Sequence, residues 1–310
     1  MTTPTPFRVA RVRPLDGPAA AGHGNAAEPA APQSAAPAVP HNPAPAAAVG
    51  ASSEQFFVVN SAADFGSDDG RVWEIVDTPF PASPANQNSP QRGRWTVGGT
   101  VDQSEFTFLA PCAPANVFGM AHNTGAPGRA LPPQAFHKAA TSVIGPGEAI
   151  VLSPTVGYVD PEAELTVVVG RSSRNLTLGN AREAVLGFTI GNDVSARDLQ
   201  KSDELWISAK SQDTFTPLGP WIVVNLDDAD AAISIVHNNT ALAAASTKDL
   251  GWSVDEILVY LSSFMTLHPG DVILTGFPAE CRQIQPGDTV VCRITGIGEL
   301  TNPVRSLVAE

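Results

Sequence analysis

The sequence predicts a mainly β protein with a few helices, and two features carry this prediction. Short runs rich in Val, Ile, Phe and Trp recur along the chain and are separated by clusters of Gly, Pro, Asn and Asp, as expected for strands and turns. The clearest helical spacing of apolar residues is confined to residues 254–264. With 310 residues, 43% of them apolar, the chain can form one large domain or two modest ones.

The N-terminal third divides into three parts. Residues 1–16 contain an alternating run at 7–12 and are expected to add an edge strand to a sheet. Residues 17–53 are mostly Ala and Pro, cannot offset their ordering entropy by burial, and are expected to be disordered. Residues 54–110 hold β-type runs at 56–59, 71–76 and 94–97, and they predict a small β-rich N-terminal domain.

Charge and composition narrow the functional classes. The formal net charge of -13 and the lack of a basic patch argue against nucleic acid or an anionic membrane as a partner. No apolar run approaches the roughly 18–20 residues needed to span a bilayer, and the N-terminus lacks the apolar core of a signal peptide. Three widely spaced cysteines predict neither disulfides nor a thiolate metal site. We therefore expect a soluble cytoplasmic protein.

Three acidic residues are the main candidates for chemistry. Glu162 and Glu164 lie two positions apart in a strand-like run, so they share one face, while the intervening side chains point into a core. This spacing alone fits an ordinary solvated strand face. Asp193 changes the balance, because it ends a second apolar strand at 187–192, where a carboxylate is well placed to bind a hard cation.

Other polar residues allow functional and structural interpretations. His122 ends a strand beside a Gly- and Pro-rich loop and could act as a general base. Lys210 is consistent equally with enolate stabilisation and with a solvated surface position. His137 and Lys138 are expected at a surface turn. Ser195 and Asp198 have the spacing of a capping box, which predicts a helix start.

Several motifs in order make the region from about residue 110 to 304 similar to the fumarylacetoacetate hydrolase superfamily. They are Glu162-x-Glu164-Leu, Gly187-Phe-Thr-Ile-Gly-Asn-Asp-Val-Ser-Ala-Arg-Asp-Leu-Gln200, Ala209-Lys-Ser-x-Asp-Thr-Phe215, and Pro269-Gly-Asp-Val-Ile-Leu-Thr-Gly276. We therefore expect residues 111–310 to form a catalytic domain of this family.

The resemblance implies a mixed β-sandwich roll, a homodimer, and one Mg²⁺, Mn²⁺ or Ca²⁺ held by two glutamates and an aspartate. Carried over by position, these ligands are Glu162, Glu164 and Asp193. Such an ion grips the oxygens of a small 2-oxo or 2,4-dioxo acid substrate. Lys210 would stabilise the enolate, and the residues expected to bind substrate are Gln200, Arg197 and Thr275.

The sequence departs from the family pattern on the substrate side. The segment that usually supplies a water-activating His and Glu is replaced by Gly119-Met-Ala-His-Asn-Thr-Gly125, in which His122 is a candidate base. A Thr-Gly-Thr-Pro motif has become Thr275-Gly-Phe-Pro278. The arginine that often precedes the Ala-Lys motif is Ser208.

We expect a divalent-metal-dependent hydrolase that cleaves a C–C bond in an acylpyruvate-type 2,4-dioxo acid. In this hypothesis His122 and Lys210 are the catalytic residues. Two alternatives stay open. One is an isomerase, decarboxylase or dehydratase acting on a 2-oxo acid through the same enolate. The other is a non-catalytic module that binds metal and oxo acids.

Overall fold

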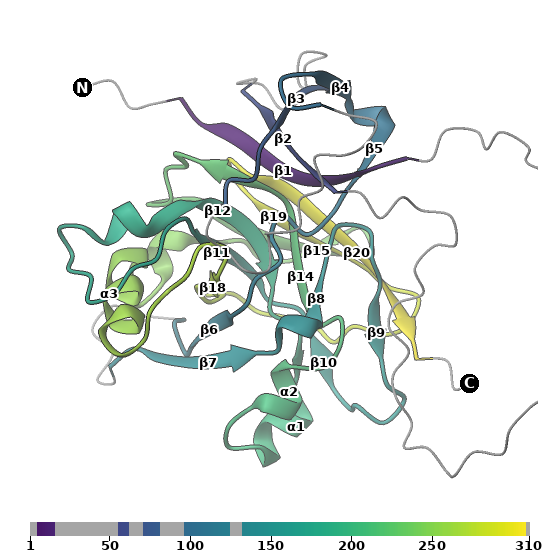
Figure 1. Cartoon of the computed structure of the whole chain (residues 1–310). Coiled ribbons are helices and arrows are strands. Elements are labelled where there is room, and N and C mark those ends of the chain that lie inside the picture. The colour runs from purple at the N-terminus through teal and green to yellow at the C-terminus, as the bar shows by residue number, and fades with distance from the viewer. Residues whose placement is uncertain (1–4, 16–54, 62–70, 81–95, 125–131, 308–310) are drawn as a thin grey trace, which may run out of the picture.

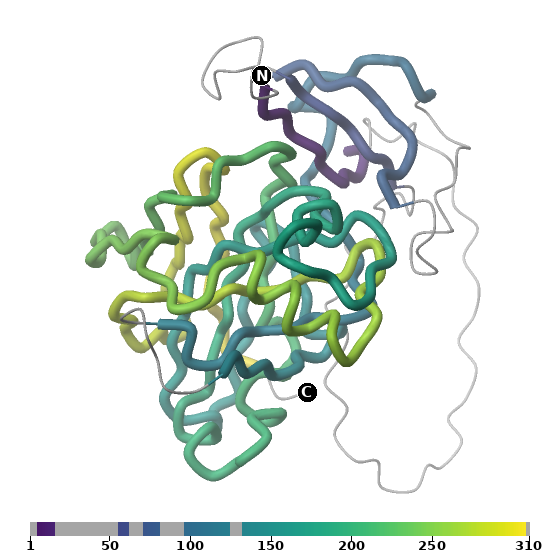
Figure 2. The backbone as a smooth tube through the Cα atoms, turned by 90° about the vertical axis from the view of Figure 1, so that its left-hand side faces the viewer, coloured from purple at the N-terminus to yellow at the C-terminus, as the bar shows by residue number. Residues whose placement is uncertain are grey.

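The computed structural model describes residues 5–15, 55–61, 71–80, 96–124 and 132–307. The Ala/Pro-rich segment expected at 17–53 and most of the loop after His122 lie outside these ranges. Figure 1 shows a lobe of N-terminal strands above a larger β body, with short helices at its margins, and Figure 2 shows the same division after a quarter turn. The mainly β fold is confirmed.

One twelve-stranded sheet runs through both parts of the described chain. Two of its strands lie off the main path, with β5 (Phe106–Phe108) beside β1 and β8 (Val143–Ile144) beside β14. In hydrogen-bonded order the other ten are β4 (Thr100–Asp102), β3 (Val72–Val76), β2 (Phe56–Asn60), β1 (Phe7–Pro14), β14 (Thr216–Val224), β12 (Val185–Asn192), β11 (Ala163–Val169), β18 (Val272–Leu274), β6 (Val117–Ala121) and β7 (Gln134–Lys138).

A second sheet packs against the first and completes the sandwich. Its main path is β16 (Thr240–Ala241), β15 (Ala232–His237), β19 (Thr289–Ile294), β20 (Gly298–Ser306) and β9 (Ile150–Leu152), and β17 (Ala245–Ser246) also pairs with β15. The largest apolar cluster joins the two sheets, for example through Leu165 and Ile190 from the first and Ile235 and Leu300 from the second. A short ribbon of β10 (Val159–Asp160) and β13 (Ser195–Ala196) lies beside the site described below.

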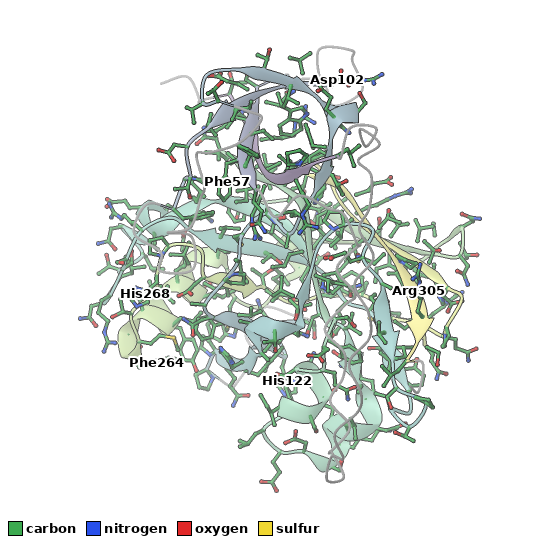
Figure 3. All side chains as sticks on the ribbon, turned by 45° about the vertical axis from the view of Figure 1, so that its right-hand side comes forward. Phe57, Asp102, His122, Phe264, His268 and Arg305 are labelled. Atoms are coloured by element: carbon green, nitrogen blue, oxygen red, sulfur yellow. The ribbon has the colours of Figure 1, made fainter. Side chains whose placement is uncertain are left out.

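The sequence suggested that the N-terminal strand lies at the edge of a sheet. The structure shows that this prediction is wrong. β1 pairs with β2 on one side and with β14 on the other, so it connects the N-terminal lobe to the body. Its alternate side chains enter different cores: Val12 packs in the lobe, and Val9 packs with Phe57 at the junction. Figure 3 shows Phe57 at this junction. The sheet therefore continues across the domain boundary expected near residue 110. The boundary itself stays a prediction.

The predicted helix is confirmed as α3 (Val254–Phe264). Ser253 caps it in a capping box with Glu256, and the apolar residues with helical spacing are buried. Two shorter helices, α1 (Arg197–Ser202) and α2 (Ile207–Lys210), follow β13. Of the run expected as a strand at 94–97, the first two residues lie outside the described ranges, Val97 lies in a turn, and the next strand starts at Thr100. No helix in the described ranges is long and apolar enough to cross a membrane.

Candidate active site

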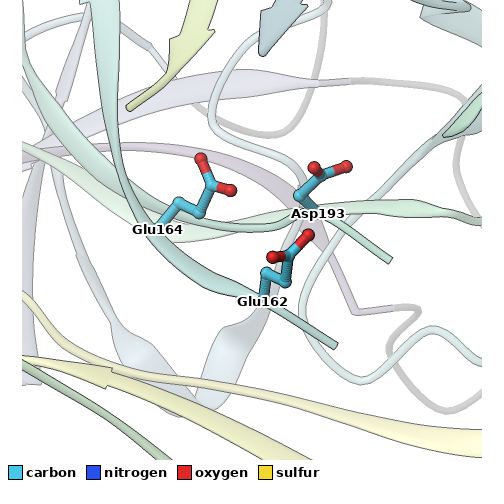
Figure 4. Close-up of side chains that lie close together, drawn as sticks. All are labelled: Glu162, Glu164 and Asp193. Carbon is cyan, nitrogen blue, oxygen red and sulfur yellow. The ribbon is translucent and has the colours of Figure 1, made fainter. Parts of the chain in front are cut away.

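Three carboxylates meet where β11 and β12 run side by side. The two strands are antiparallel with Ala163 opposite Asn192, so Glu162 and Glu164 at the start of β11 face Asp193 just after β12. One oxygen from each carboxylate lies within 4.8 Å of the others. Figure 4 shows the three side chains lying close together. The strand register therefore assembles an all-oxygen donor set from residues about thirty positions apart.

The donor set is strongly acidic, with two of its members buried and Glu162 half-buried. Glu164 and Asp193 are 3% and 1% exposed. Burial, and then the charges of Asp193 and Glu162, raise the pKa of Glu164 well above its usual value, although Lys210 and the Gly276 N–H act in the opposite direction. A cation at this point would relieve that repulsion. Three carboxylates with room for further oxygen ligands fit a hard divalent ion such as Mg²⁺.

Two buried lysines hold Asp193 between them. Lys210 Nζ contacts one Asp193 oxygen, lies 3.1 Å from Glu162 Oε2, and donates to Ser195 Oγ at 2.6 Å. Lys138 Nζ lies 2.5 Å from the other Asp193 oxygen. Burial would raise the pKa of Asp193, but these two ammonium groups outweigh it and lower the pKa. For Lys210, burial favours the neutral form, yet Asp193 and Glu162 raise its pKa, so it is a fixed cation.

Lys138 and Ser195 differ from their sequence predictions. Lys138 is not at a surface turn: it ends strand β7 and is 0% exposed. Ser195 does not cap a helix, because it pairs with Asp160 in the β10–β13 ribbon and α1 starts two residues later, with Ala196 at its N-cap. The Ser195 hydroxyl lies within 3.1 Å of Glu162 Oε2 and accepts from Lys210. Both residues belong to the network around Asp193.

A cavity of about 370 Å³ opens over these groups. Its size is at the lower end of the range of about 300–1,000 Å³ typical of small-molecule sites. It brings together seven of the residues expected from the sequence, which are His122, Glu162, Glu164, Asp193, Arg197, Gln200 and Lys210.

Thr275 is the expected substrate-binding residue that the structure does not place in this cavity. Its side chain is 0% exposed, and its hydroxyl donates to the Leu165 carbonyl oxygen at 2.8 Å. Gly276 and Phe277 line the wall instead. The Thr275 hydroxyl thus links the end of β18 to β11, and its hydrogen bond is used to hold the sheet together.

Arg197 organises one side of the cavity. Its guanidinium lies 2.8 Å from Asp160 and 3.0 Å from Glu162, and it donates to the Gln200 side-chain oxygen at 3.0 Å. Asp160, which the sequence did not single out, is largely buried, and this burial raises its pKa to about 6 although Arg197 opposes the shift. Arg197 therefore positions both Glu162 and Gln200.

His122 lies at the mouth of the cavity. It follows β6 in a left-handed conformation with φ of 57°, and its ring centroid is 5.3 Å from that of Trp206. In Figure 3 it lies just above the α1–α2 segment. Sequence reasoning missed Trp206 and also Phe136, whose ring lies 4.7 Å from Lys210 Nζ. Aromatic residues in short polar stretches carry no periodic signal, so only the structure shows them as cavity walls.

Comparisons with known proteins show what this chain is similar to. The family model described as "Fumarylacetoacetate (FAA) hydrolase C-terminal" matches residues 111–305. Protein Rv2993c of Mycobacterium tuberculosis is 46% identical over 175 residues, covering 56% of this chain and 66% of that protein, just under two thirds of its length. Oxaloacetate tautomerase FAHD2A, mitochondrial, of Homo sapiens is 35% identical over 226 residues, covering 66% of this chain and 71% of that one.

A solved structure extends the similarity to the N-terminal part. It is 5-carboxymethyl-2-hydroxymuconate delta-isomerase from Mycobacterium smegmatis, 36% identical, with a TM-score of 0.71. The match covers 81% of this chain and 95% of that one.

Proposed function

The chain belongs to the fumarylacetoacetate hydrolase family, and from that premise we propose that it is a divalent-metal-dependent enzyme that hydrolyses a C–C bond in an acylpyruvate-type 2,4-dioxo acid. One observation carries the proposal. The acidic triad, the fixed cation Lys210 and the candidate base His122 line the same cavity. We also propose that the protein works as a homodimer and that its ligand is this small oxo acid.

Glu162, Glu164 and Asp193 would hold the ion, which we propose is Mg²⁺, with Mn²⁺ or Ca²⁺ as substitutes. When bound, it would supply Lewis-acid polarisation of the substrate's oxo group and a template for its oxygens. The rest of the chemistry belongs to side chains of the protein.

Lys210 would stabilise the negative charge that develops on the substrate. Its ammonium group is buried beside Asp193 and Glu162, where a fixed cation acts in a low-dielectric environment. Gln200 would position the substrate: its side-chain oxygen accepts from Arg197, which leaves its amide N–H groups as donors to a substrate oxygen.

His122 would activate water. As the water oxygen attacks C4 of the dioxo acid, His122 accepts its proton. The C3–C4 bond then breaks, and its electron pair forms the enolate of the pyruvate part, which Lys210 stabilises. Protonation of C3 gives pyruvate, and the acyl part leaves as a carboxylic acid. One water is consumed, and no oxidant or reductant is needed.

A second candidate is oxo–enol isomerisation of a 2-oxo acid. The names of two relatives favour it, since one is an oxaloacetate tautomerase and the other a 5-carboxymethyl-2-hydroxymuconate delta-isomerase. It needs the triad and Lys210 but no attacking water, so it shares the enolate step with hydrolysis.

Two assays on the Mn²⁺-loaded full chain separate the candidates. Pyruvate release from acylpyruvates reports hydrolysis, and the loss of enol absorbance of oxaloacetate reports isomerisation. We expect His122→Asn to lower hydrolysis by about 10²–10⁴-fold and to leave the enol reaction near the wild-type rate. His268→Asn, an exposed histidine outside the cavity, is the matched control and should leave both rates unchanged.

Each alternative result has a definite meaning. Enol interconversion without pyruvate release would replace hydrolysis by the second candidate. Binding of oxalate by the metal-loaded protein, with no turnover of any oxo acid, would make the protein a binding module.

A further inference from the structure

A second cavity of about 340 Å³ adjoins the first. The two share Ala121, His122, Phe136 and Trp206 in their linings. The wall between them is therefore built largely of rings: Trp206 lies 5.3 Å from His122 and 5.6 Å from Phe136, measured between ring centroids, in edge-to-face arrangements. A ligand that passes this wall would extend from the metal triad into the second space.

The position of Trp206 is linked to that of Lys210. Trp206 has a left-handed backbone with φ of 61°, which is uncommon for a bulky residue and is found where the surroundings enforce it. It is the N-cap of α2, and its carbonyl oxygen accepts from the N–H of Lys210 at 2.9 Å. The same residue thus bounds the second cavity and starts the helix that carries the catalytic lysine.

The two cavities differ in chemistry. The first contains Arg197, Lys201 and Lys210, which suit the carboxylate end of an oxo acid. The described lining of the second contains no lysine or arginine, and its only acidic residue is Glu204. Six of its nine described lining residues are Ala, Leu, Phe, Trp or Tyr, and Leu205 is 82% exposed. A second carboxylate at this end would meet Glu204, with no cation among the described lining residues.

We infer that the second cavity is the acyl subsite of the enzyme, and that it takes the uncharged aliphatic or aromatic group attached to C4 of the dioxo acid. This inference rests on the proposed function and narrows its substrate class. His122 lines both cavities, which places the base at the junction between the pyruvate end and the acyl end, where the bond to be cleaved would lie. Trp206 and Phe136 form the wall that selects the acyl group.

The kcat/KM for pyruvate release should rise with acyl length in the series acetyl-, butanoyl- and hexanoylpyruvate. Burial of one methylene is worth about 0.8 kcal/mol, so we expect roughly fourfold per methylene. Benzoylpyruvate should also exceed acetylpyruvate, and an acylpyruvate with a carboxylate at the end of its acyl chain should fall below the uncharged compound of equal length.

Two variants test the assignment of the residues. Leu205→Glu, an exposed position that should not affect folding, should remove most of the length dependence. Trp206→Ala should do the same and also lower kcat through α2, whereas Trp206→Phe should keep the length dependence. Leu178→Ala is the control, because Leu178 is 65% exposed and lines neither cavity.

A binding measurement separates failure of this inference from failure of the proposed reaction. Calorimetric titration of straight-chain 2-oxo acids, from pyruvate to 2-oxooctanoate, needs no turnover. If no acylpyruvate releases pyruvate but affinity rises with chain length and Leu205→Glu abolishes the rise, the subsite stands and hydrolysis is wrong. If pyruvate is released at a kcat/KM independent of acyl length, or best with the terminal carboxylate, the subsite is wrong.

Discussion

Lys138 Nζ lies 2.5 Å from Asp193 Oδ1, and both side chains are almost completely buried. Lys210 occupies the other oxygen of the same carboxylate. The two lysines come from β7 and α2, which lie next to each other beside the carboxylate triad. Together with Arg197, which lies 3.0 Å from Glu162, these lysines offset the negative charge of the triad, and this explains how three acidic groups can lie so close together.

Replacing Lys138 by Met should destabilise the fold. Removal of one partner leaves a buried charge short of a counterion, which typically costs 3–5 kcal/mol, and we expect about 3 kcal/mol because Lys210 still pairs with Asp193. Guanidinium unfolding of the metal-free protein measures this. Lys248→Met, which removes an exposed ion pair with Asp230, should leave the midpoint unchanged. An unchanged midpoint for Lys138→Met would show that the buried pair does not stabilise the fold.

Gly119→Ala should displace the Phe136 ring, which forms part of the cavity wall. A Cβ at this position would lie 2.2 Å from the Phe136 ring, its cross-strand neighbour, so the ring would have to move. We expect a loss of about 1–3 kcal/mol in unfolding free energy and a higher KM, because Phe136 lines the site. Gly179→Ala is the control, since its nearest contact would be 3.8 Å. Equal stability and KM for the two variants would contradict this account.

Ser195→Ala tests the position of Ser195 in the network. A helix cap would contribute to stability alone, whereas a hydroxyl bonded to Lys210 and Glu162 should also affect turnover. We expect a loss of about 1–3 kcal/mol together with a lower kcat. Ser202→Ala, an exposed serine at the end of α1, should change neither quantity. A stability loss with unchanged kcat would show that the Ser195 hydroxyl has a structural role only.

Local patterns predicted much of this molecule. The apolar spacing and Ser253 define α3, and the two-residue spacing of Glu162 and Glu164 placed both carboxylates on one face before any pairing was known. These features depend on neighbours in sequence. Asp193 lies near the two glutamates because β11 pairs with β12. The resemblance to the family predicted this proximity, whereas residue spacing in the sequence did not.

What the sequence did not reveal depends on long-range contacts. The residues around Lys138 in the sequence are typical of a surface position. Lys138 is buried because it ends β7, where its side chain contacts Asp193. Ser195 matches a capping box, but pairing with β10 delays the helix. For β1, an alternating run shows a strand but not how many partners it has. The part of the site assembled from β7, β13 and α2 was therefore beyond local reasoning.

Glu164→Gln tests whether Glu164 is a metal ligand or a structural residue, because the two roles predict opposite changes in unfolding free energy with and without metal. In the metal-free protein the change removes a buried charge beside Asp193 and Glu162, so unfolding free energy should stay equal or rise. With metal the order should reverse. Wild type gains about 2.7 kcal/mol at an ion concentration of 100 times Kd, and the variant should gain little. Thermal unfolding with EDTA and with excess Mn²⁺ measures both.

We propose above that Glu162, Glu164 and Asp193 bind one divalent cation. Calorimetric titration of MnCl₂ into EDTA-stripped protein tests it most directly, with wild type and Glu164→Gln compared under the same conditions. We predict one site per chain in wild type and a loss of affinity of at least about tenfold in the variant, equivalent to 1.4 kcal/mol. Binding of Mn²⁺ by Glu164→Gln with the stoichiometry and affinity of wild type would contradict the claim.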